Sequence, residues 1–226
     1  MLVFNCTKAF AAFIADAQGA PVETPSIRMI ADDPSFCDGT AMHWVVHLVK
    51  IARRNCVIAM HVRSRYAIVM VGVRKGDFSG FVNAFCHRLV NEMVFLCAEE
   101  GLVGEEYASL VAENFVDKHQ VILACVRGDR SVQAHINDVS LALESEAGDM
   151  GGLPVGPDEA FDFGRHVNAL LRTTRESRDS FYPFEVMCEH WFEDVCVEIV
   201  DPEVLDRLSE EKTVPDNVIV LADYRK

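Results

Sequence analysis

The stretch WVVHLVKIARRNCVIAMHVRSRYAIVMVGVRKGDF, residues 44–78, decides the fold. Three runs rich in Val, Ile and Met lie in or beside it, at 43–51, 56–63 and 66–73, and the polar turns ARRN and RSR separate them. Apolar runs of this length divided by polar turns predict an antiparallel meander. Because both faces of the third run are apolar, we expect a central strand that is covered on both sides.

The sequence around this meander alternates between helical and strand patterns. Residues 78–100 form an apolar stripe at helical spacing, which predicts a long helix packed on the sheet. Its apolar positions are Phe81, Phe85, Leu89, Met93 and Leu96. Further strands are predicted at 2–5 and 121–126, helices at 7–17, 105–114 and from 131, and a long loop at 20–42. The fold class is therefore α+β, with an antiparallel sheet of about five strands and helices packed on it.

The C-terminal third has a different composition from the rest. The segment GDMGGLPVGP reads as a linker, which divides the chain into an α+β core at 1–146, a linker at 147–158 and an acidic helical part at 159–226. Helices are predicted at 159–175, 183–196 and 202–212, and 218–221 is an apolar patch that forms either an added strand or a tail. We expect this part to pack on the core.

Charge is distributed unevenly along the chain. The formal net charge is −14, of which −12 falls between Glu144 and the C-terminus. Between Asp38 and Asp77 there is no acidic residue at all. The segment instead contains Lys50, Arg53, Arg54, Arg63, Arg65, Arg74 and Lys75. One basic segment in an acidic protein suits an anionic partner, a protein partner, or the protein's own acidic surface.

The predicted partner-binding residues are the arginines and lysine at the ends of the meander. They are Arg53, Arg54, Arg63, Arg65, Arg74 and Lys75. Arginine forks suit phosphate and carboxylate groups. The hairpin ends are some 25 Å apart at roughly 3.3 Å per residue, so only a large partner would bridge them. General nucleic-acid binding is disfavoured, because the acidic surface elsewhere would repel phosphate.

Other catalytic and metal patterns are weak. His43, His47 and His61 suggest a metal site, but positions four apart on a strand are about 13 Å apart, too far for one ion. Cys86 and His87 point to different sides of a helix, so a cysteine nucleophile is not indicated. A metal site at Cys188, His190 and Cys196 is also disfavoured, because a C-x-H step on a helix points its side chains to different faces. The RGD at 127–129 reads as a hairpin or cap turn, and the glycine segment lacks a phosphate-loop lysine. We therefore predict no catalytic residue, metal or cofactor.

The eight cysteines do not form a recognisable disulfide framework. Nearly all lie within apolar strand or helix patterns, and no CxxC spacing occurs, which favours buried, reduced thiols. The longest apolar runs fall short of the roughly 18 to 20 residues that span a bilayer. Because no export signal is evident at the N-terminus, we expect a cytoplasmic protein.

The meander, followed by a long helix and by DRSVQAHINDV, resembles a bacterial domain of unknown function. That domain occurs alone or at the C-terminal end of plasmid-borne open-reading-frame-three-like proteins. The matching positions are Trp44, Arg53, Arg54, Asp129 to Ser131 and Asn137, and NALLRTTRESRDSFYPFEVMCEHW is similar to the family's closing helices. The resemblance covers roughly residues 2 to 195 and implies a fold and a bacterial setting but no activity.

These observations favour a non-enzymatic binding or accessory protein that uses its basic meander to contact an anionic or protein partner. The alternative is a small enzyme or nucleotide-binding protein whose site is assembled from residues far apart in the sequence. A third possibility is that the C-terminal third simply neutralises the basic segment. The sequence leaves the oligomeric state open.

Overall fold

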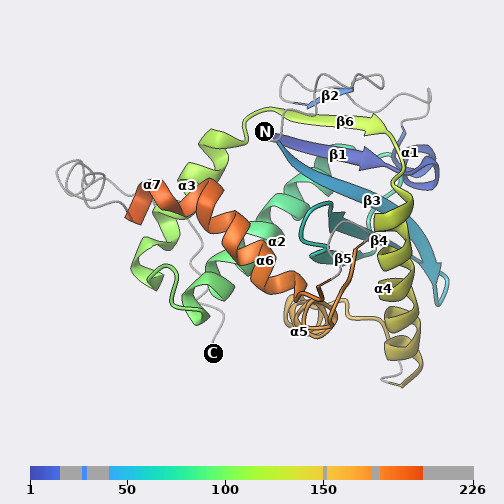
Figure 1. Cartoon of the computed structure of the whole chain (residues 1–226). Coiled ribbons are helices and arrows are strands. Elements are labelled where there is room, and N and C mark those ends of the chain that lie inside the picture. Colours follow the sequence, from blue (N-terminus) through green and yellow to red (C-terminus); the bar gives the residue numbers. More distant parts are fainter. Residues whose placement is uncertain (16–26, 30–40, 150–151, 175–178, 201–226) are drawn as a thin grey trace.

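The computed structural model describes residues 1–15, 27–29, 41–149, 152–174 and 179–200 (Figure 1). The strands are β1 (Leu2–Cys6), β2 (Ile27–Met29), β3 (Met42–Ile51), β4 (Arg54–His61), β5 (Ala67–Val71) and β6 (Ile122–Val126). The α-helices are α1 (Lys8–Ile14), α2 (Phe78–Glu99), α3 (Ala108–Lys118), α4 (Arg130–Asp149), α5 (Pro157–Asn168), α6 (Pro183–Trp191) and α7 (Val197–Val200). A 3₁₀ turn, η2 (Glu105–Tyr107), precedes α3, and a π-helical turn, η3 (Phe192–Cys196), joins α6 to α7.

The strands form one six-stranded sheet in the order β2-β6-β1-β3-β4-β5. The predicted meander is confirmed, because β3, β4 and β5 pair antiparallel. Its first turn is the two-residue loop Ala52–Arg53, with φ angles of 47° and 64°, and paired positive φ values match the twist of a tight hairpin. The α+β class is confirmed as well, although β1 pairs in parallel with both β3 and β6, which the sequence pattern did not indicate.

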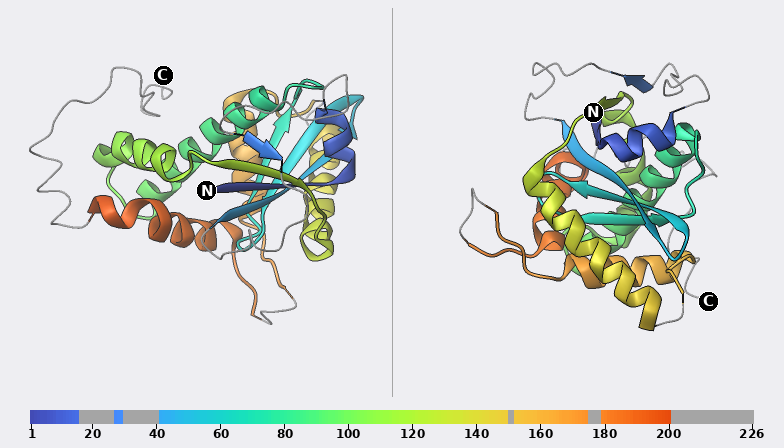
Figure 2. Two further views of the ribbon diagram at one scale, coloured as in Figure 1. Left: turned by 90° about the horizontal axis from the view of Figure 1, so that it is seen from above. Right: turned by 90° about the vertical axis from the view of Figure 1, so that its right-hand side faces the viewer.

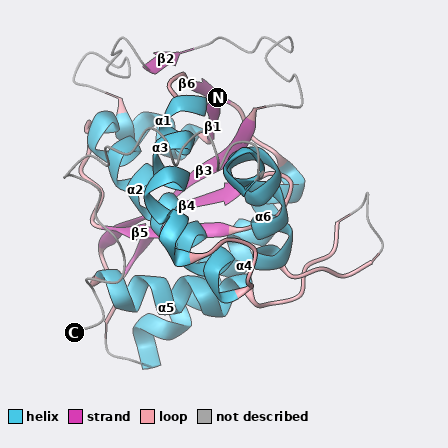
Figure 3. Cartoon of the chain, turned by 90° about the vertical axis from the view of Figure 1, so that its left-hand side faces the viewer, coloured by secondary structure: helices cyan, strands magenta, loops and turns pink. Residues whose placement is uncertain are grey.

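Helices cover both faces of the sheet (Figures 2 and 3). The first face packs against α1, α2, α3 and α6 in the larger apolar cluster, which contains the predicted α2 stripe. The second face packs against α4 and α5. Successive residues of a strand point to opposite faces of the sheet. In β3, Trp44 and Val46 therefore enter the first cluster, whereas Val45 enters the second. Beyond the sheet, α3 and α6 extend side by side (Figure 2).

The prediction that the third run forms a central strand is wrong. Both faces of β5 are covered, as expected, but β5 is the edge of the sheet. Two side chains form hydrogen bonds with the backbone groups that β5 directs away from β4. Asn168 accepts from the Ala67 N–H at 2.7 Å and donates to the Ala67 carbonyl at 2.9 Å, and Arg88 donates to the Val69 carbonyl at 3.3 Å. The Asn168 amide thus replaces one peptide of a missing neighbour strand.

Replacing Asn168 with leucine is expected to lower the free energy of unfolding by about 2 kcal/mol, because the buried N–H and carbonyl of Ala67 then lose their partners. Urea unfolding of the variant measures this loss. Asn137→Leu is the matched control, since Asn137 is exposed and its side-chain oxygen accepts from Gln133 on the surface of α4. Equal losses in the two variants would show that Asn168 does not protect the edge.

The predicted helix 159–175 is too long, because α5 ends at Asn168. The buried stripe of α4, formed by Val132, Ile136, Val139 and Leu143, is confirmed. The seven cysteines within the described residues are unbridged. Among the described helices, none is both long and apolar enough to cross a membrane. The predicted helix 202–212 and the apolar patch 218–221 lie outside the described residues.

Candidate functional site

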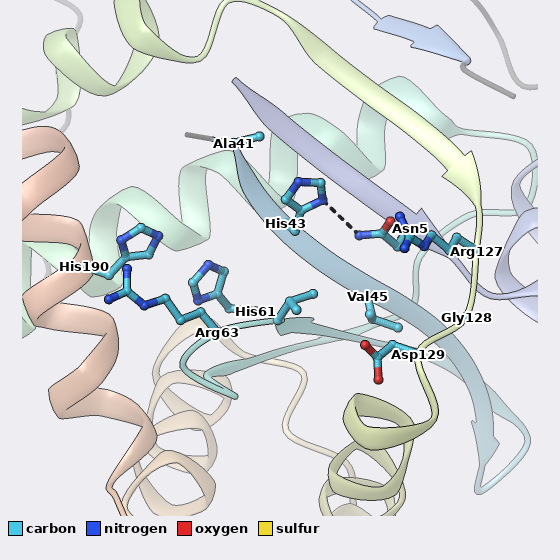
Figure 4. A pocket seen from close by; sticks show the side chains of 11 residues that line it. Asn5, Ala41, His43, Val45, His61, Arg63, Arg127, Gly128, Asp129 and His190 are labelled. Atoms are coloured by element: carbon cyan, nitrogen blue, oxygen red, sulfur yellow. Dashed lines mark hydrogen bonds between the residues drawn. The ribbon is translucent and has the colours of Figure 1, made fainter. Parts of the chain in front are cut away.

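A cavity of about 290 Å³ lies at the end of the sheet where β3 begins and β4 ends, between the part of the second face that α4 leaves uncovered and α6 (Figure 4). The loop at 127–129, between β6 and α4, forms one end, and the turn after β4 together with α6 forms the other. The residues that line it are Asn5, Ala41, His43, Val45, His61, Val62, Arg63, Arg127, Gly128, Asp129 and His190. We call this cavity the histidine pocket.

The parallel pairing of β1 accounts for the position of the pocket. Because β1 lies between β3 and β6, Asn5 is in register with Val45 on one side and with Cys125 on the other. The chain leaves β6 through Arg127, whose N–H donates to the Cys6 carbonyl at 3.0 Å, and enters α4. The helix then crosses β3 and β4, which leaves the β1 side of the face open.

Asn5 and Asp129 are fixed by hydrogen bonds at the first end of the pocket. The Asn5 amide donates to the Trp44 carbonyl at 3.4 Å and lies 3.5 Å from His43 Nδ1, and its Oδ1 accepts from the Cys125 thiol at 3.3 Å. Asp129 caps α4, because its Oδ1 accepts from the Ser131 and Val132 N–H groups at 2.8 and 3.0 Å. Part of its negative charge is thereby offset by the helix N-terminus.

Two stacked imidazoles form the second end. The rings of His61 and His190 lie 5.1 Å apart at an interplanar angle of 25°, and Trp44 lies against His61 at 5.2 Å. His61 Nδ1 accepts from the Ser64 N–H at 3.3 Å and lies 2.9 Å from the Ser64 hydroxyl. An accepting Nδ1 leaves the proton of a neutral imidazole on Nε2. The Arg63 side chain runs toward His190 (Figure 4).

Both imidazoles are held toward the neutral form. Burial lowers the pKa of His61 well below its usual value, and the charges of His190 and Arg63 lower it further. Burial likewise lowers the pKa of His190, with a further contribution from Arg63, while Asp194 opposes the shift. The pocket therefore offers permanent positive charge from Arg63 and Arg127 beside imidazoles that are held in the neutral form.

Contacts with α3 hold α6, and with it His190, in place. Asn114 donates to the Val195 carbonyl at 2.6 Å, and Lys118 donates to the Asp194 carbonyl. These two carbonyls belong to η3, where a π-helical turn changes the regular backbone bonding. His119 donates through Nδ1 to the Phe115 carbonyl at 3.0 Å, and its Nε2 lies 3.3 Å from the Asp194 carboxylate. These contacts hold the C-terminal end of α6 against α3.

The structure separates the six predicted binding residues. Arg63 lines the histidine pocket, whereas Arg53 and Arg54 are exposed at the opposite end of β4. Arg65 is buried and donates to the Ser131 hydroxyl at 3.2 Å. Arg74 lines a second cavity of about 390 Å³ between β5, α2 and the start of α5, and Lys75 is exposed.

Sequence reasoning missed most of the pocket. The RGD segment was interpreted only as a hairpin or cap turn, and His190 was considered only with Cys188 and Cys196, as a disfavoured metal set. His43 and His61 were weighed with His47 as metal ligands, but His47 Nδ1 lies 3.0 Å from the Thr7 hydroxyl instead. Within the described part of the chain, no group of three or more His, Cys, Asp or Glu residues is arranged to hold a metal ion.

Comparison with known proteins gives one match. The family model for a Domain of unknown function (DUF6933) matches residues 3–186. This span includes every residue of the pocket except His190. No curated protein and no solved structure matches the chain.

Proposed function

This chain belongs to the DUF6933 family, a domain of unknown function, and we propose that it is a binding protein that takes a small anionic ligand into the histidine pocket. The observation that carries the proposal is the placement of Arg63 and Arg127 at opposite ends of one cavity (Figure 4). Guanidinium groups are the side chains best suited to carboxylate and phosphate. The Asn5 amide and the imidazoles add hydrogen-bonding groups between them.

The size of the cavity supports a small ligand. Ligand pockets typically enclose about 300–1,000 Å³ and combine apolar walls with a few placed polar groups. The histidine pocket, at about 290 Å³, lies at the lower limit of this range. Its floor includes Val45, and its polar groups come from separate strands and loops. A metabolite-sized anion fits such a site better than a nucleic-acid backbone does.

Arg63→Ala is expected to weaken binding of inorganic phosphate or sulfate about 10- to 100-fold, since one charge-assisted hydrogen bond contributes about 1.5–3 kcal/mol. Isothermal titration of the full chain measures the affinity. Arg53→Ala is the matched control, because it removes an exposed arginine from the far end of the same hairpin. If Arg53→Ala weakens binding as much as Arg63→Ala does, the anion does not bind in the pocket.

A second candidate is a small enzyme or nucleotide-binding protein. Its support is that the pocket is assembled from five separate segments and combines the Asp129 carboxylate with three imidazoles, which are groups that transfer protons. Release of product from a phosphate ester or a nucleotide, abolished by His61→Asn and by Arg63→Ala but retained in Arg53→Ala, would favour this candidate over simple binding.

The proposal includes a bacterial, cytoplasmic setting. Its supports are the resemblance of residues 44–78 to a bacterial domain and the seven unbridged cysteines of the described residues, because disulfides are rare in a reducing compartment. A protein partner that carries the anionic group, such as an exposed carboxylate terminus, fits the same chemistry as a free anion.

A further inference from the structure

Three groups that can each carry a positive charge meet at one end of the histidine pocket. His61 and His190 are stacked at 5.1 Å, and Arg63 lies beside them. Arginine is always protonated, so full protonation of both imidazoles would place three like charges around one end of a partly enclosed cavity. Like charges in such a setting disfavour one another. Without a ligand, the electrostatic repulsion at this end of the pocket is therefore lowest when both imidazoles are neutral.

The carboxylates near this end only partly offset these charges. Asp194 and Glu193, on the turn that follows α6, favour protonation of His190. Asp194 is itself engaged with His119, the residue directly after α3, at 3.3 Å. Burial raises the pKa of the Asp194 carboxyl, but the hydrogen bond and charge of His119, with Lys118 and His190, outweigh it and leave the pKa below its usual value. Its negative charge is thus shared with α3.

The other neighbours of the pair are basic or neutral. His43 on β3 and Arg65 in the turn after β4 both disfavour a charge on His61, and His119 disfavours one on His190. These groups lie on β3, in the turn after β4, directly after α3 and on the helix that carries His190. A bound anion would add the negative charge that this end lacks.

We propose that an anion binds at the Arg63 end of the pocket together with one proton, which passes from solvent to the imidazole of His190. This inference rests on the proposed function and specifies which end of the pocket is used. The proton goes to His190 because His61 is almost fully buried and its Nδ1 accepts the Ser64 N–H, a bond that protonation at Nδ1 would break. His190 is only half-buried.

The sign of the pH dependence follows from this coupling. Burial and Arg63 lower the pKa of His190 in the free protein, and a bound anion raises it. Above the pKa that His190 has in the complex, the affinity for the anion is independent of pH. As the pH falls from that pKa toward the pKa of His190 in the free protein, the affinity rises, and below the latter it levels off. Between these values one linked proton changes the affinity about tenfold per pH unit.

Titration of the full chain with sulfate between pH 5.5 and 8, in two buffers of different ionisation enthalpy, tests the coupling. Sulfate does not titrate in this range, so any proton taken up comes to the protein. We expect uptake of about one proton per sulfate in the coupled range, and loss of that uptake in His190→Asn. His87→Asn is the matched control, because it removes an exposed histidine of α2 outside the pocket.

The outcomes distinguish this inference from the function on which it rests. If neither sulfate nor phosphate binds at any pH, the proposed function fails and the inference fails with it. If sulfate binds and Arg63→Ala weakens it, but no proton is taken up, the function stands and the coupling is overturned. Uptake that persists unchanged in His190→Asn overturns the assignment of the proton to His190, whatever its fate in His87→Asn.

Discussion

Glu92→Leu is expected to lower the free energy of unfolding by about 3–5 kcal/mol, the usual cost of removing one partner of a buried ion pair. Glu92 lies on α2, 2% exposed, between two partners. Its Oε2 accepts from the Tyr66 hydroxyl at 2.8 Å, and its Oε1 accepts from Arg88 Nε. Without the carboxylate, a largely buried guanidinium and a buried phenol lose their acceptor. Arg88 also caps the edge of β5, so the loss reaches the sheet.

Guanidinium unfolding of two further variants separates charge from burial. Glu92→Gln keeps an acceptor for Tyr66 and is expected to lose less than Glu92→Leu. Glu99, on the same helix as Glu92, forms an ion pair with Arg165 of α5 in which both side chains are well exposed. Glu99→Gln breaks this pair and is expected to change stability by less than about 1 kcal/mol. A loss for Glu92→Leu no larger than that of Glu99→Gln would contradict a structural role for the buried pair.

The same carboxyl predicts a pH dependence of stability. Burial raises the pKa of Glu92 above its ordinary value of 4.5, although Arg88 and Tyr66 oppose the shift. A raised value means that the native protein binds this proton more tightly than the unfolded chain does. The contribution of this proton to the free energy of unfolding is therefore fully present below pH 4.5. It is lost as the pH rises through the pKa that Glu92 has in the native protein. Comparison with Glu92→Gln, which lacks the titration, isolates the effect.

Phe85→Ala is expected to cost about 3–5 kcal/mol, because the truncation of a buried aromatic side chain leaves a cavity. Phe85 of α2 is fully buried. Its ring lies 5.0 Å from Phe4 of β1 and 4.9 Å from Trp44 of β3. It therefore joins the long helix to the parallel pair of strands. Since Trp44 in turn contacts His61, we also expect the histidine pocket to loosen.

Thermal unfolding together with a sulfate titration measures both consequences of Phe85→Ala. Phe161→Ala is the matched control: its ring, on α5, is half-buried and pairs with Phe95 of α2 at 5.1 Å. We expect a smaller loss of stability and unchanged sulfate affinity for this control. Equal losses in the two variants would show that the ring cluster around Phe85 does not dominate the packing of α2.

Short-range periodicity predicted the secondary structure well. The apolar runs of β3, β4 and β5 and the stripe of α2 are visible in the sequence because each pattern repeats within two to four residues. The position of β5 was not visible in this way. An apolar pattern on both faces indicates that both faces are covered, but it does not show whether the strand has a neighbour on each side. Here Asn168, about a hundred residues away in the sequence, bonds to the free edge of β5.

The pocket was beyond the reach of local patterns for the same reason. Arg63 could be proposed from the basic segment, but His190, Arg127 and Asn5 join it only through the parallel pairing of β1 with β3 and β6. Parallel pairs have no connecting hairpin that would reveal their register. The strongest signal in the sequence was the basic segment that lacks acidic residues. Of the six binding residues predicted from it, only Arg63 lies in the pocket.

The pairing of β1 also sets the order in which the molecule is completed during synthesis. Leu2 leaves the ribosome well before its neighbours in the sheet, Met42 and Ile122. At about 5–20 residues per second, the nascent chain waits for several seconds between the first strand and its last partner. The hairpins of β3, β4 and β5 need only local contacts and can form in that interval. The histidine pocket, which requires Asn5 and Asp129 together, would be among the last features of the nascent protein to appear.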